Sequence, residues 1–492
     1  MTVPGASILT QSTDLFSEPP QHLVAFSVRS VLTFAGPGLI IASVTIGSGE
    51  LVWASRSGAV FGYQLLWCFL LAGIFKGVQV YVAARHITLT GEHPMVSWKA
   101  IPGPPSWFPL LIALPTILVM PIAFSGISEI LGGYLRELTG ASQSDSDVGP
   151  FGGLEFWENF WGTTVLTTCL ALALSSSQKM LERTSAFVIG LIVVCAAVSV
   201  AVCHLDIAGF LSGLFIPYVP NYQPWVETNY AETFRGRSPW LEVALYLGAV
   251  GGGTYDYLGY IGMLREKKWG LSGSKAVSRE QLQNLSHRQI ICAKTWTRAA
   301  LVDTVVSFTS VVLVTLLFAA LGALLLHTEQ RIPDNETLLT EQESFLIQLH
   351  PQLRWLYRAG VFLAFIGTLY GAFEIYRHTV VESARALLPG WTQNRHIRTW
   401  RNLTVAVCYG SGMAMIWLPV GISGDVLSRM TFGAVIGGAT LCGLWCLAML
   451  WTDYTRLPKH LRMSRSLWVV TLIGGITMTA LGAQTLIVFF SS

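Results

Sequence analysis

Long apolar runs dominate this chain and place the strongest limit on how it can fold. Of its 492 residues, 52% are apolar or aromatic, and only 12% are Asp, Glu, Lys or Arg. A soluble protein carries about twice that charged share. A run of about 20 apolar residues is long enough to cross a bilayer as a helix. We therefore expect an all-α integral membrane protein whose main partner is the lipid bilayer.

Eleven such runs can be read along the sequence. They lie at roughly 28–55, 62–85, 107–133, 160–176, 184–204, 239–263, 297–326, 353–376, 400–420, 428–451 and 465–490. The polar residues 1–27 are expected to form a cytoplasmic tail, and residues 28–490 a single transmembrane domain.

The short segments between the runs predict an orientation. Lys and Arg concentrate in loops on the same side as the N-terminus, such as 85–105, 264–298 and 377–401, whereas acidic residues gather in 141–159 and 327–345. Positive charge stays on the cytoplasmic side of a membrane. The sequence thus predicts a plasma (inner) membrane protein with a cytoplasmic N-terminus and an external C-terminus.

Composition also argues against several other classes of protein. A net charge of +3, with basic residues scattered over short loops, argues against a nucleic-acid partner. The eight cysteines include no Cys-x-x-Cys pair, so neither a zinc module nor a disulfide framework is indicated. We expect no enzyme activity, no catalytic residues and no resident cofactor, and a monomer by default.

Two of the runs are interrupted by glycine. Thr45-Ile-Gly-Ser-Gly-Glu50 breaks the first near 47–49, and Gly248-Ala-Val-Gly-Gly-Gly-Thr-Tyr-Asp256 breaks the sixth. Glycine weakens a helix by about 1 kcal/mol. Interrupted helices in corresponding positions of two halves are typical of inverted-repeat transporters, which bind substrate at the unwound backbone.

This spacing predicts a 5+5 inverted repeat with broken helices 1 and 6. Repeat one spans about 28–204, repeat two about 239–451, and residues 465–490 form an extra helix.

Both interruptions contain an acidic residue, which makes them candidate binding sites. An unpaired carboxylate is costly inside a membrane, so Glu50 and Asp256 are functional candidates and candidate metal ligands. The alternative is that small residues only let helices pack closely, and this is favoured for Gly36, Gly38, Gly73 and Gly77. The predicted substrate-binding residues are Gly47, Ser48, Gly49, Glu50, Gly252, Gly253, Thr254, Tyr255 and Asp256.

The pattern of these residues resembles the Nramp family of proton-coupled divalent-metal transporters. The segment from Gly36 to Glu50 is similar to the family's first helix, whose motif ends Asp-Pro-Gly-Asn. Residues 62–91 look like its second helix and following loop, and Ser128 to Gly132 resembles part of its third helix. The resemblance implies the leucine-transporter fold and transport by alternating access.

The sequence departs from the family at the metal site. The family's metal-binding Asp falls on Gly47 and its Asn on Glu50, while its Met-Pro-His falls on Tyr255-Asp256-Tyr257. An acid of the family's third helix falls on Gly126, with its neighbour kept as Glu129. The scaffold resembles an Nramp protein, whereas the site does not.

The altered site leaves three functions open. Glu50 and Asp256, with freed backbone carbonyls, would suit a hard divalent cation such as Mg²⁺ or Mn²⁺. Alternatively, open amides at Gly47-Ser-Gly49 would hold a small carboxylate, oxyanion or amino-acid-like solute. The third possibility is a membrane sensor that does not transport. The lack of a soluble output domain argues against it.

Other ionisable residues are candidates for coupling transport to H⁺ or Na⁺. Glu129 is the first candidate, with a structural hydrogen bond as its alternative, and Asp303 and Glu374 are weaker ones. Lys76 lies inside the second run, where we expect it to pair with an acid rather than to reach the membrane surface.

Overall fold

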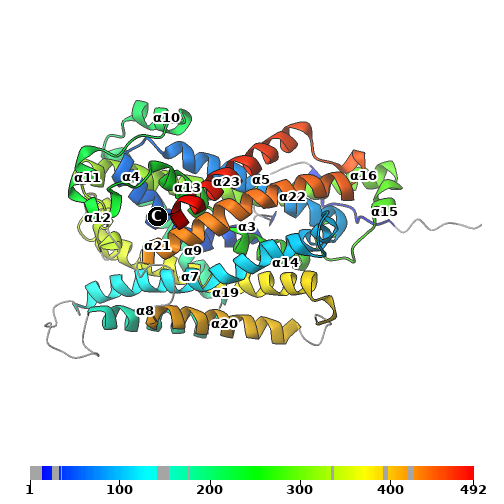
Figure 1. Ribbon diagram of the computed structural model, residues 1–492, viewed down its shortest axis with the longest axis horizontal. Coiled ribbons are helices and arrows are strands. Elements are labelled where there is room, and N and C mark those ends of the chain that lie inside the picture. Colours follow the sequence, from blue (N-terminus) through cyan, green and yellow to red (C-terminus); the bar gives the residue numbers. More distant parts are fainter. Residues whose placement is uncertain are drawn as a thin grey trace, which may run out of the picture.

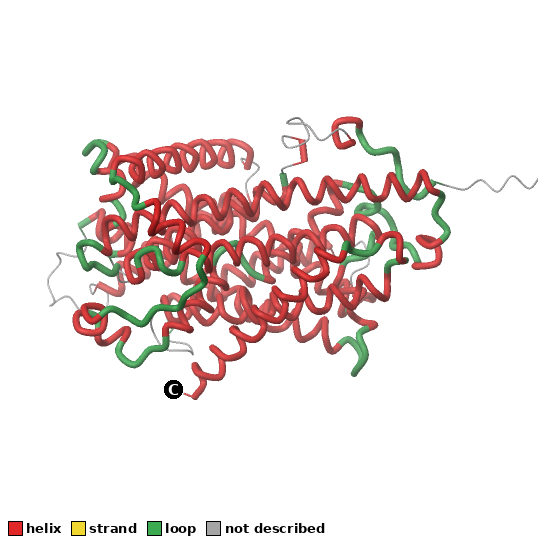
Figure 2. Tube along the Cα trace, turned by 90° about the horizontal axis from the view of Figure 1, so that it is seen from above, coloured by secondary structure: helices red, strands yellow, loops and turns green. Residues whose placement is uncertain are grey.

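The regular structure of this protein is helical. The computed structural model describes residues 14–24, 33–34, 36–140, 154–174, 178–333, 337–391, 397–418 and 426–491. Within these residues every regular element is a helix (Figure 2), which confirms the expected all-α class. The long helices lie side by side in one bundle (Figure 1).

Helical structure lies on each of the eleven predicted runs. The main elements are α3 (Pro37–Thr45), η1 (Ile46–Ala54), α4 (Ser55–Phe61), α5 (Leu66–Thr90), α7 (Trp107–Thr139), α8 (Leu154–Leu174), α9 (Gln178–Val202), α13 (Pro239–Ala249), α14 (Thr254–Lys267), α16 (His287–Leu321), α19 (Leu353–Leu387), α20 (Ile397–Trp417), α21 (Val426–Gly433), η6 (Ala434–Thr440), α22 (Leu441–Arg456) and α23 (Arg465–Ser491).

The shorter helices include α1 before the first long helix, η4 as a direct continuation of α16, and several in the connections between long helices. They are α1 (Gln21–Val24), α6 (Pro94–Ser97), η2 (Trp98–Ala100), α10 (Ile207–Phe215), α11 (Pro224–Asn229), α12 (Ala231–Phe234), α15 (Arg279–Gln283), η4 (Gly322–His327), α17 (Leu338–Glu341), α18 (Ser344–Ile347), η5 (Pro389–Trp391) and η7 (Lys459–Leu461).

Length and apolar composition identify six of the described helical segments as able to cross a membrane. A seventh is added if Gly190–Val202 and Ile207–Phe215, bent by 119°, count as one span. The first, fourth, sixth and ninth predicted runs are not among these segments, and the sixth is divided into the shorter helices α13 and α14. Large apolar side chains such as Leu118 and Leu313 are 64% and 57% exposed, as expected of helices facing lipid. These features together indicate an integral membrane protein.

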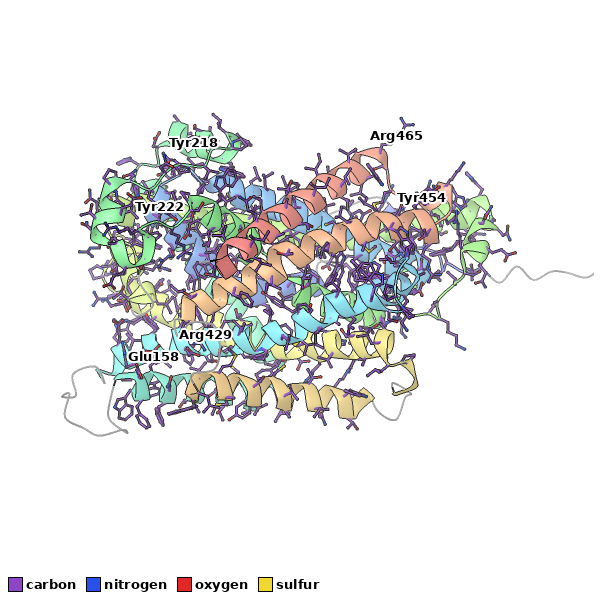
Figure 3. The ribbon with its side chains drawn as sticks, in the orientation of Figure 1. Glu158, Tyr218, Tyr222, Arg429, Tyr454 and Arg465 are labelled. Carbon is purple, nitrogen blue, oxygen red and sulfur yellow. The ribbon has the colours of Figure 1, made fainter. Side chains whose placement is uncertain are left out.

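Polar and aromatic side chains mark the two ends of the bundle. Tyr218, Tyr222 and Glu158 lie toward one end, and Tyr454 and Arg465 toward the other (Figure 3). Tyrosine is enriched where a membrane helix meets water. The bundle between these ends therefore has the layout of a membrane-embedded core.

Close packing of the long helices forms the core around the two interrupted runs. Helix α5 packs along α16, α14 along α19, and α7 along α8. Helices α3 and η1 lie against both α16 and α19. The first and sixth predicted runs are thus enclosed by α5, α16 and α19.

Candidate functional site

The interruption predicted in the sixth run is present between α13 and α14. Gly251 and Gly252 adopt positive φ angles of 78° and 84°, which residues other than glycine rarely adopt. A Cβ atom on Gly252 would lie 2.6 Å from an Asp256 side-chain oxygen, so space also requires glycine there. We call residues 248–253 the α13–α14 junction.

The carbonyl groups of this junction are bound by a buried lysine. The Lys76 ammonium on α5 is 0% exposed. It donates to the carbonyls of Gly248, Val250 and Gly252 at 2.7, 2.6 and 2.7 Å. An ammonium has three N–H donors and no acceptor, so all its donors are used. Lys76 was expected to pair with an acid, but its direct partners are backbone carbonyls.

Two buried carboxylates bind amide groups of the same junction. Glu50 Oε1 accepts a hydrogen bond from the Gly251 N–H at 3.3 Å, and Asp256 Oδ2 accepts one from the Gly253 N–H at 2.9 Å. Both side chains are almost completely buried, at 0% and 1% exposed. The structure therefore brings the two predicted acids to one short segment, where both interact electrostatically with Lys76.

Each carboxylate retains one buried oxygen available for another ligand. Glu50 Oε2 and Asp256 Oδ1 have no hydrogen-bond partner among the described residues. Buried polar atoms are nearly always paired, so an unpaired one calls for a functional explanation. A bound cation or a proton would supply the missing partner.

The first predicted run differs from expectation, because it does not unwind at 47–49. Residues Ile46–Ala54 form a π-helix that continues directly from α3 into α4. A π-helical turn widens the helix without opening it, and such turns are frequent at functional sites. Here it places Glu50 opposite the α13–α14 junction.

Gly47 and Gly49 serve close helix packing in this structure. The Gly47 N–H donates to Thr368 Oγ1 at 3.2 Å. A Cβ atom on Gly49 would lie 2.7 Å from the Ala249 carbonyl oxygen. The expected open amide turn is therefore absent from this described segment. The side chain of Ser48 lies outside the described part of the structure.

Thr254 and Tyr255 lie at the start of α14, and Tyr255 lines a small cavity beside the junction. Thr254 Oγ1 donates to the Gly437 carbonyl at 3.2 Å, and the Tyr255 ring packs edge-on against Tyr376. The cavity has a volume of about 50 Å³, and Gly49, Tyr255 and Met430 are among the residues that line it. A space of this size holds one or two waters or an ion.

The coupling candidates are each held by a specific partner. Asp303 accepts hydrogen bonds from the Gly36 and Gly38 amides and from the Tyr260 hydroxyl. Its carboxylate thereby lies at the N-terminal end of α3, where negative charge is stabilised.

The other two candidates form ion pairs with arginine. Glu129 on α7 pairs with Arg429 on α21, and both side chains are largely buried. Glu374 on α19 pairs with Arg377 one turn later, at 2.6 Å. The three candidates do not share one environment, and each joins or stabilises helices.

Sequence reasoning did not assign several residues that shape this site. The sequence indicates an acidic partner for Lys76 rather than backbone carbonyls, and it assigns no role to Arg429, which pairs with Glu129. Tyr257, whose hydroxyl donates to the Gly251 carbonyl at 2.6 Å, was seen only as a replaced family position. A charged residue within an apolar run is the signal that marks Lys76 as a candidate residue of this site.

The described residues contain no group of three or more His, Cys, Asp or Glu placed to hold a metal ion. Any cation at the junction would therefore be bound by two carboxylates completed by backbone oxygens or water. Such ligands are the ones that hard cations prefer. With both acids and Lys76 ionised, the cluster carries a net charge of −1.

Comparison with known proteins supports the resemblance seen in the sequence. Residues 38–253 match the family described as natural resistance-associated macrophage protein-like, Nramp. Natural resistance-associated macrophage protein 1 of Ovis aries is 24% identical over 44% of this chain and 37% of its own length. Natural resistance-associated macrophage protein 2 of Rattus norvegicus is 31% identical over 23% of this chain and 19% of its own.

Solved structures extend the likeness to nearly the whole chain. The manganese transporter of Eremococcus coleocola, in complex with an aromatic bis-isothiourea compound, matches with a TM-score of 0.58 and 13% identity. That match covers 97% of this chain and 90% of the other. A mutant of the same transporter gives a TM-score of 0.60 at 14% identity, covering 96% and 90%. The two proteins share a fold.

These findings confirm the Nramp resemblance over residues 38–253. The chain aligns with only 37% and 19% of the length of the two curated relatives named above.

Proposed function

We propose that this protein is a secondary transporter of the leucine-transporter fold that moves a hard divalent cation, of the Mg²⁺ or Mn²⁺ type, by alternating access. In this proposal the eleven predicted runs are membrane spans forming a 5+5 inverted repeat plus one helix. The N-terminus is cytoplasmic and the C-terminus external. The Nramp resemblance and the fold shared with a manganese transporter support a metal as cargo.

The observation that carries this proposal is the pair of half-satisfied carboxylates at the junction. Glu50 and Asp256 each keep one buried oxygen without a partner among the described residues. Two carboxylate groups supply two negative charges and hard oxygen ligands, which match a divalent cation of this type. The soft thioether ligand of the family is missing, which favours hard cations over late transition metals.

Three features favour a cation over a carboxylate-bearing solute. The π-helix leaves no open amide turn at 47–49 in the described structure. The donors of Lys76 are already used by three carbonyls. The cavity of about 50 Å³ beside the junction, which Tyr255 but neither acid lines, is also far smaller than the several hundred Å³ of a typical small-molecule pocket.

We further propose that a proton is the coupling ion and that it binds the same carboxylates. When Glu50, Asp256 and Lys76 are all ionised, these three side chains carry a net charge of −1. A bound proton neutralises that charge when no cation is bound. Glu129 already has a cationic partner in Arg429. Cation flux is therefore expected to depend on pH.

A flux panel in proteoliposomes tests this function. The panel covers Mg²⁺, Mn²⁺, Ca²⁺, Na⁺ and small carboxylates, with and without a pH gradient. Glu50→Gln and Asp256→Asn should each lower divalent flux at least about tenfold, since either change removes one charged ligand. Glu266→Gln, an acid-to-amide change at a side chain 61% exposed, is the matched control.

Unchanged Mg²⁺ and Mn²⁺ flux in Glu50→Gln would contradict the oxygen-ligand site. Competition by small carboxylates would instead support a solute transporter. A correctly folded protein that moves none of these species would favour the sensor.

A further inference from the structure

The carbonyl oxygens around Lys76 are arranged as in a cation-binding site, and the Lys76 ammonium occupies the place of the cation. Three carbonyl oxygens from one short segment point at a single buried ammonium, with N···O distances of 2.7, 2.6 and 2.7 Å. Carbonyl oxygens arranged in this way replace the hydration shell of an ion, as they do in potassium-channel filters. The lysine side chain thus occupies the place of a bound ion.

The distances from the Lys76 nitrogen to the three carbonyl oxygens indicate the size of the ion that would fit between them. Mg²⁺ takes ligands at about 2.0–2.1 Å and Ca²⁺ at about 2.3–2.6 Å. The spacing around Lys76 is at or beyond the upper end of these ranges. A larger monovalent cation, similar in size to an ammonium, matches the spacing without contraction of the backbone.

The surroundings of the ammonium hold the carbonyls in this arrangement. Gly251 and Gly252 take positive φ angles, which turn alternate peptide groups in opposite directions. The Tyr257 hydroxyl donates to the Gly251 carbonyl, and the Glu50 carboxylate accepts from the Gly251 N–H, so Gly251 has partners other than Lys76. Because the backbone is fixed from both sides, the carbonyls can hold a cation without the lysine.

We propose that the carbonyls of Gly248, Val250 and Gly252 form a monovalent-cation subsite, which the protein fills with its own Lys76 ammonium. The subsite is separate from the carboxylate oxygens proposed to bind the divalent cargo. Removing the ammonium exposes the subsite, so the protein gains a dependence on K⁺ that the wild type lacks. This inference does not depend on what the protein transports.

Thermal unfolding of the purified full-length protein in detergent tests the proposal. Lys76→Met removes the charge and the N–H donors and keeps most of the stem. Its Tm should rise by at least about 2 °C when N-methyl-D-glucamine chloride is replaced by KCl at equal ionic strength. The wild type should show no such difference. Lys275→Met, which changes an exposed loop lysine in the same way, should behave like the wild type.

Each outcome decides the proposal. A folded Lys76→Met protein whose Tm does not change with K⁺ or Rb⁺ overturns it, and so does a wild type whose Tm responds equally to them.

If Lys76→Met does not fold, Lys76→Gln decides, because its amide keeps N–H donors for the carbonyls but carries no charge. A Lys76→Gln protein as stable as the wild type would show that the carbonyls need only hydrogen bonds, and would also overturn the proposal. A clear loss of Tm in Lys76→Gln would support it. The readout uses neither divalent ions nor flux, so failure here leaves the proposed transport function intact.

Discussion

Asp303 of α16 accepts hydrogen bonds from the backbone N–H of Gly38 with both carboxylate oxygens, at 3.0 and 2.9 Å. The same carboxylate also binds the Gly36 amide and the Tyr260 hydroxyl. One side chain therefore ties the start of α3 to α14 and α16. This arrangement explains why an acid lies inside α16 without assigning it a part in transport.

We expect Asp303→Ala to lower the free energy of unfolding by about 2–3 kcal/mol, because several hydrogen bonds to a charged group are lost together. Thermal unfolding in detergent measures the change. Asp206→Ala is the control, since Asp206 only caps the short exposed helix α10. Equal stability of Asp303→Ala and the wild type would show that α3 is held by other contacts.

The Glu129–Arg429 ion pair gives a second prediction. Glu129→Gln or Arg429→Met alone leaves one buried charge without its partner, which is expected to cost about 3–5 kcal/mol. The double variant should recover part of that loss because no isolated charge remains. A double-mutant cycle of unfolding free energies measures the coupling. Additive losses in the double variant would show that the pair contributes no coupling energy.

Gly252 offers a test of the junction itself. Gly252→Ala combines a φ of 84° with a Cβ only 2.6 Å from an Asp256 oxygen. We expect it to destabilise the protein by more than about 1 kcal/mol and to weaken divalent binding, because the Asp256 contact must shift. Gly190→Ala, which has open space around its Cβ, should be close to neutral. A Gly252→Ala protein with wild-type Tm and binding would mean that the junction tolerates a different backbone.

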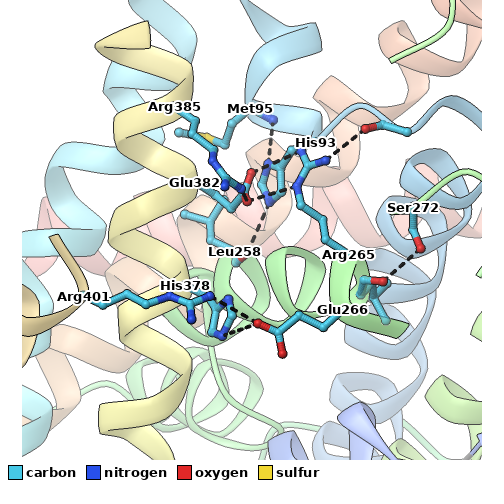
Figure 4. A network of polar contacts seen from close by, with 12 residues as sticks. His93, Met95, Leu258, Arg265, Glu266, Ser272, His378, Glu382, Arg385 and Arg401 are labelled. Atoms are coloured by element: carbon cyan, nitrogen blue, oxygen red, sulfur yellow. Dashed lines mark hydrogen bonds and ion pairs between the residues drawn. The ribbon is translucent and has the colours of Figure 1, made fainter. Parts of the chain in front are cut away.

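A buried histidine predicts how stability depends on pH. His93 lies between α5 and α7, where it accepts from the Met95 N–H and contacts the Leu258 carbonyl beside Arg265, Glu382 and Arg385 (Figure 4). Burial lowers the pKa of His93 from 6.5 to about 4, which the Glu382 carboxylate opposes and the two arginines reinforce. The folded protein therefore favours neutral His93.

The stability contributed by neutral His93 is present above pH 6.5 and is lost as the pH falls toward 4. Tm measured from pH 8 to pH 5 should decline below about pH 6.5. His93→Gln, which cannot titrate, should show a shallower decline over the same window. Identical pH profiles for the two proteins would assign the acid sensitivity to other groups.

Much of the fold could be predicted from the sequence because membrane helices have a strong signal. Apolar runs such as 107–133 and 353–376 coincide with α7 and α19, since few other structures satisfy the backbone in lipid. The break at Gly251-Gly252-Gly253 was also predictable, because three successive glycines cannot maintain a stable helix. The other features of the fold depend on tertiary contacts between helices.

The region 47–49 shows where sequence reasoning was insufficient. Its glycines indicated an unwound turn, but they fit equally well against Thr368 and Ala249, and this packing retains a helix. For Glu50 and Asp256 the sequence indicated burial and proximity, and both are observed at the junction. The binding of Lys76 to carbonyls could not be predicted, because it depends on how α5 lies relative to α13.

The α13–α14 junction is restrained simultaneously from three directions, by Lys76 of α5, Glu50 of η1 and Asp256 of α14. Any rocking of α5 away from the junction must withdraw a positive charge from beside two negative ones. A movement of α5 therefore changes the electrostatic potential at the junction. A conformational step of this kind would change which ions can bind inside the protein.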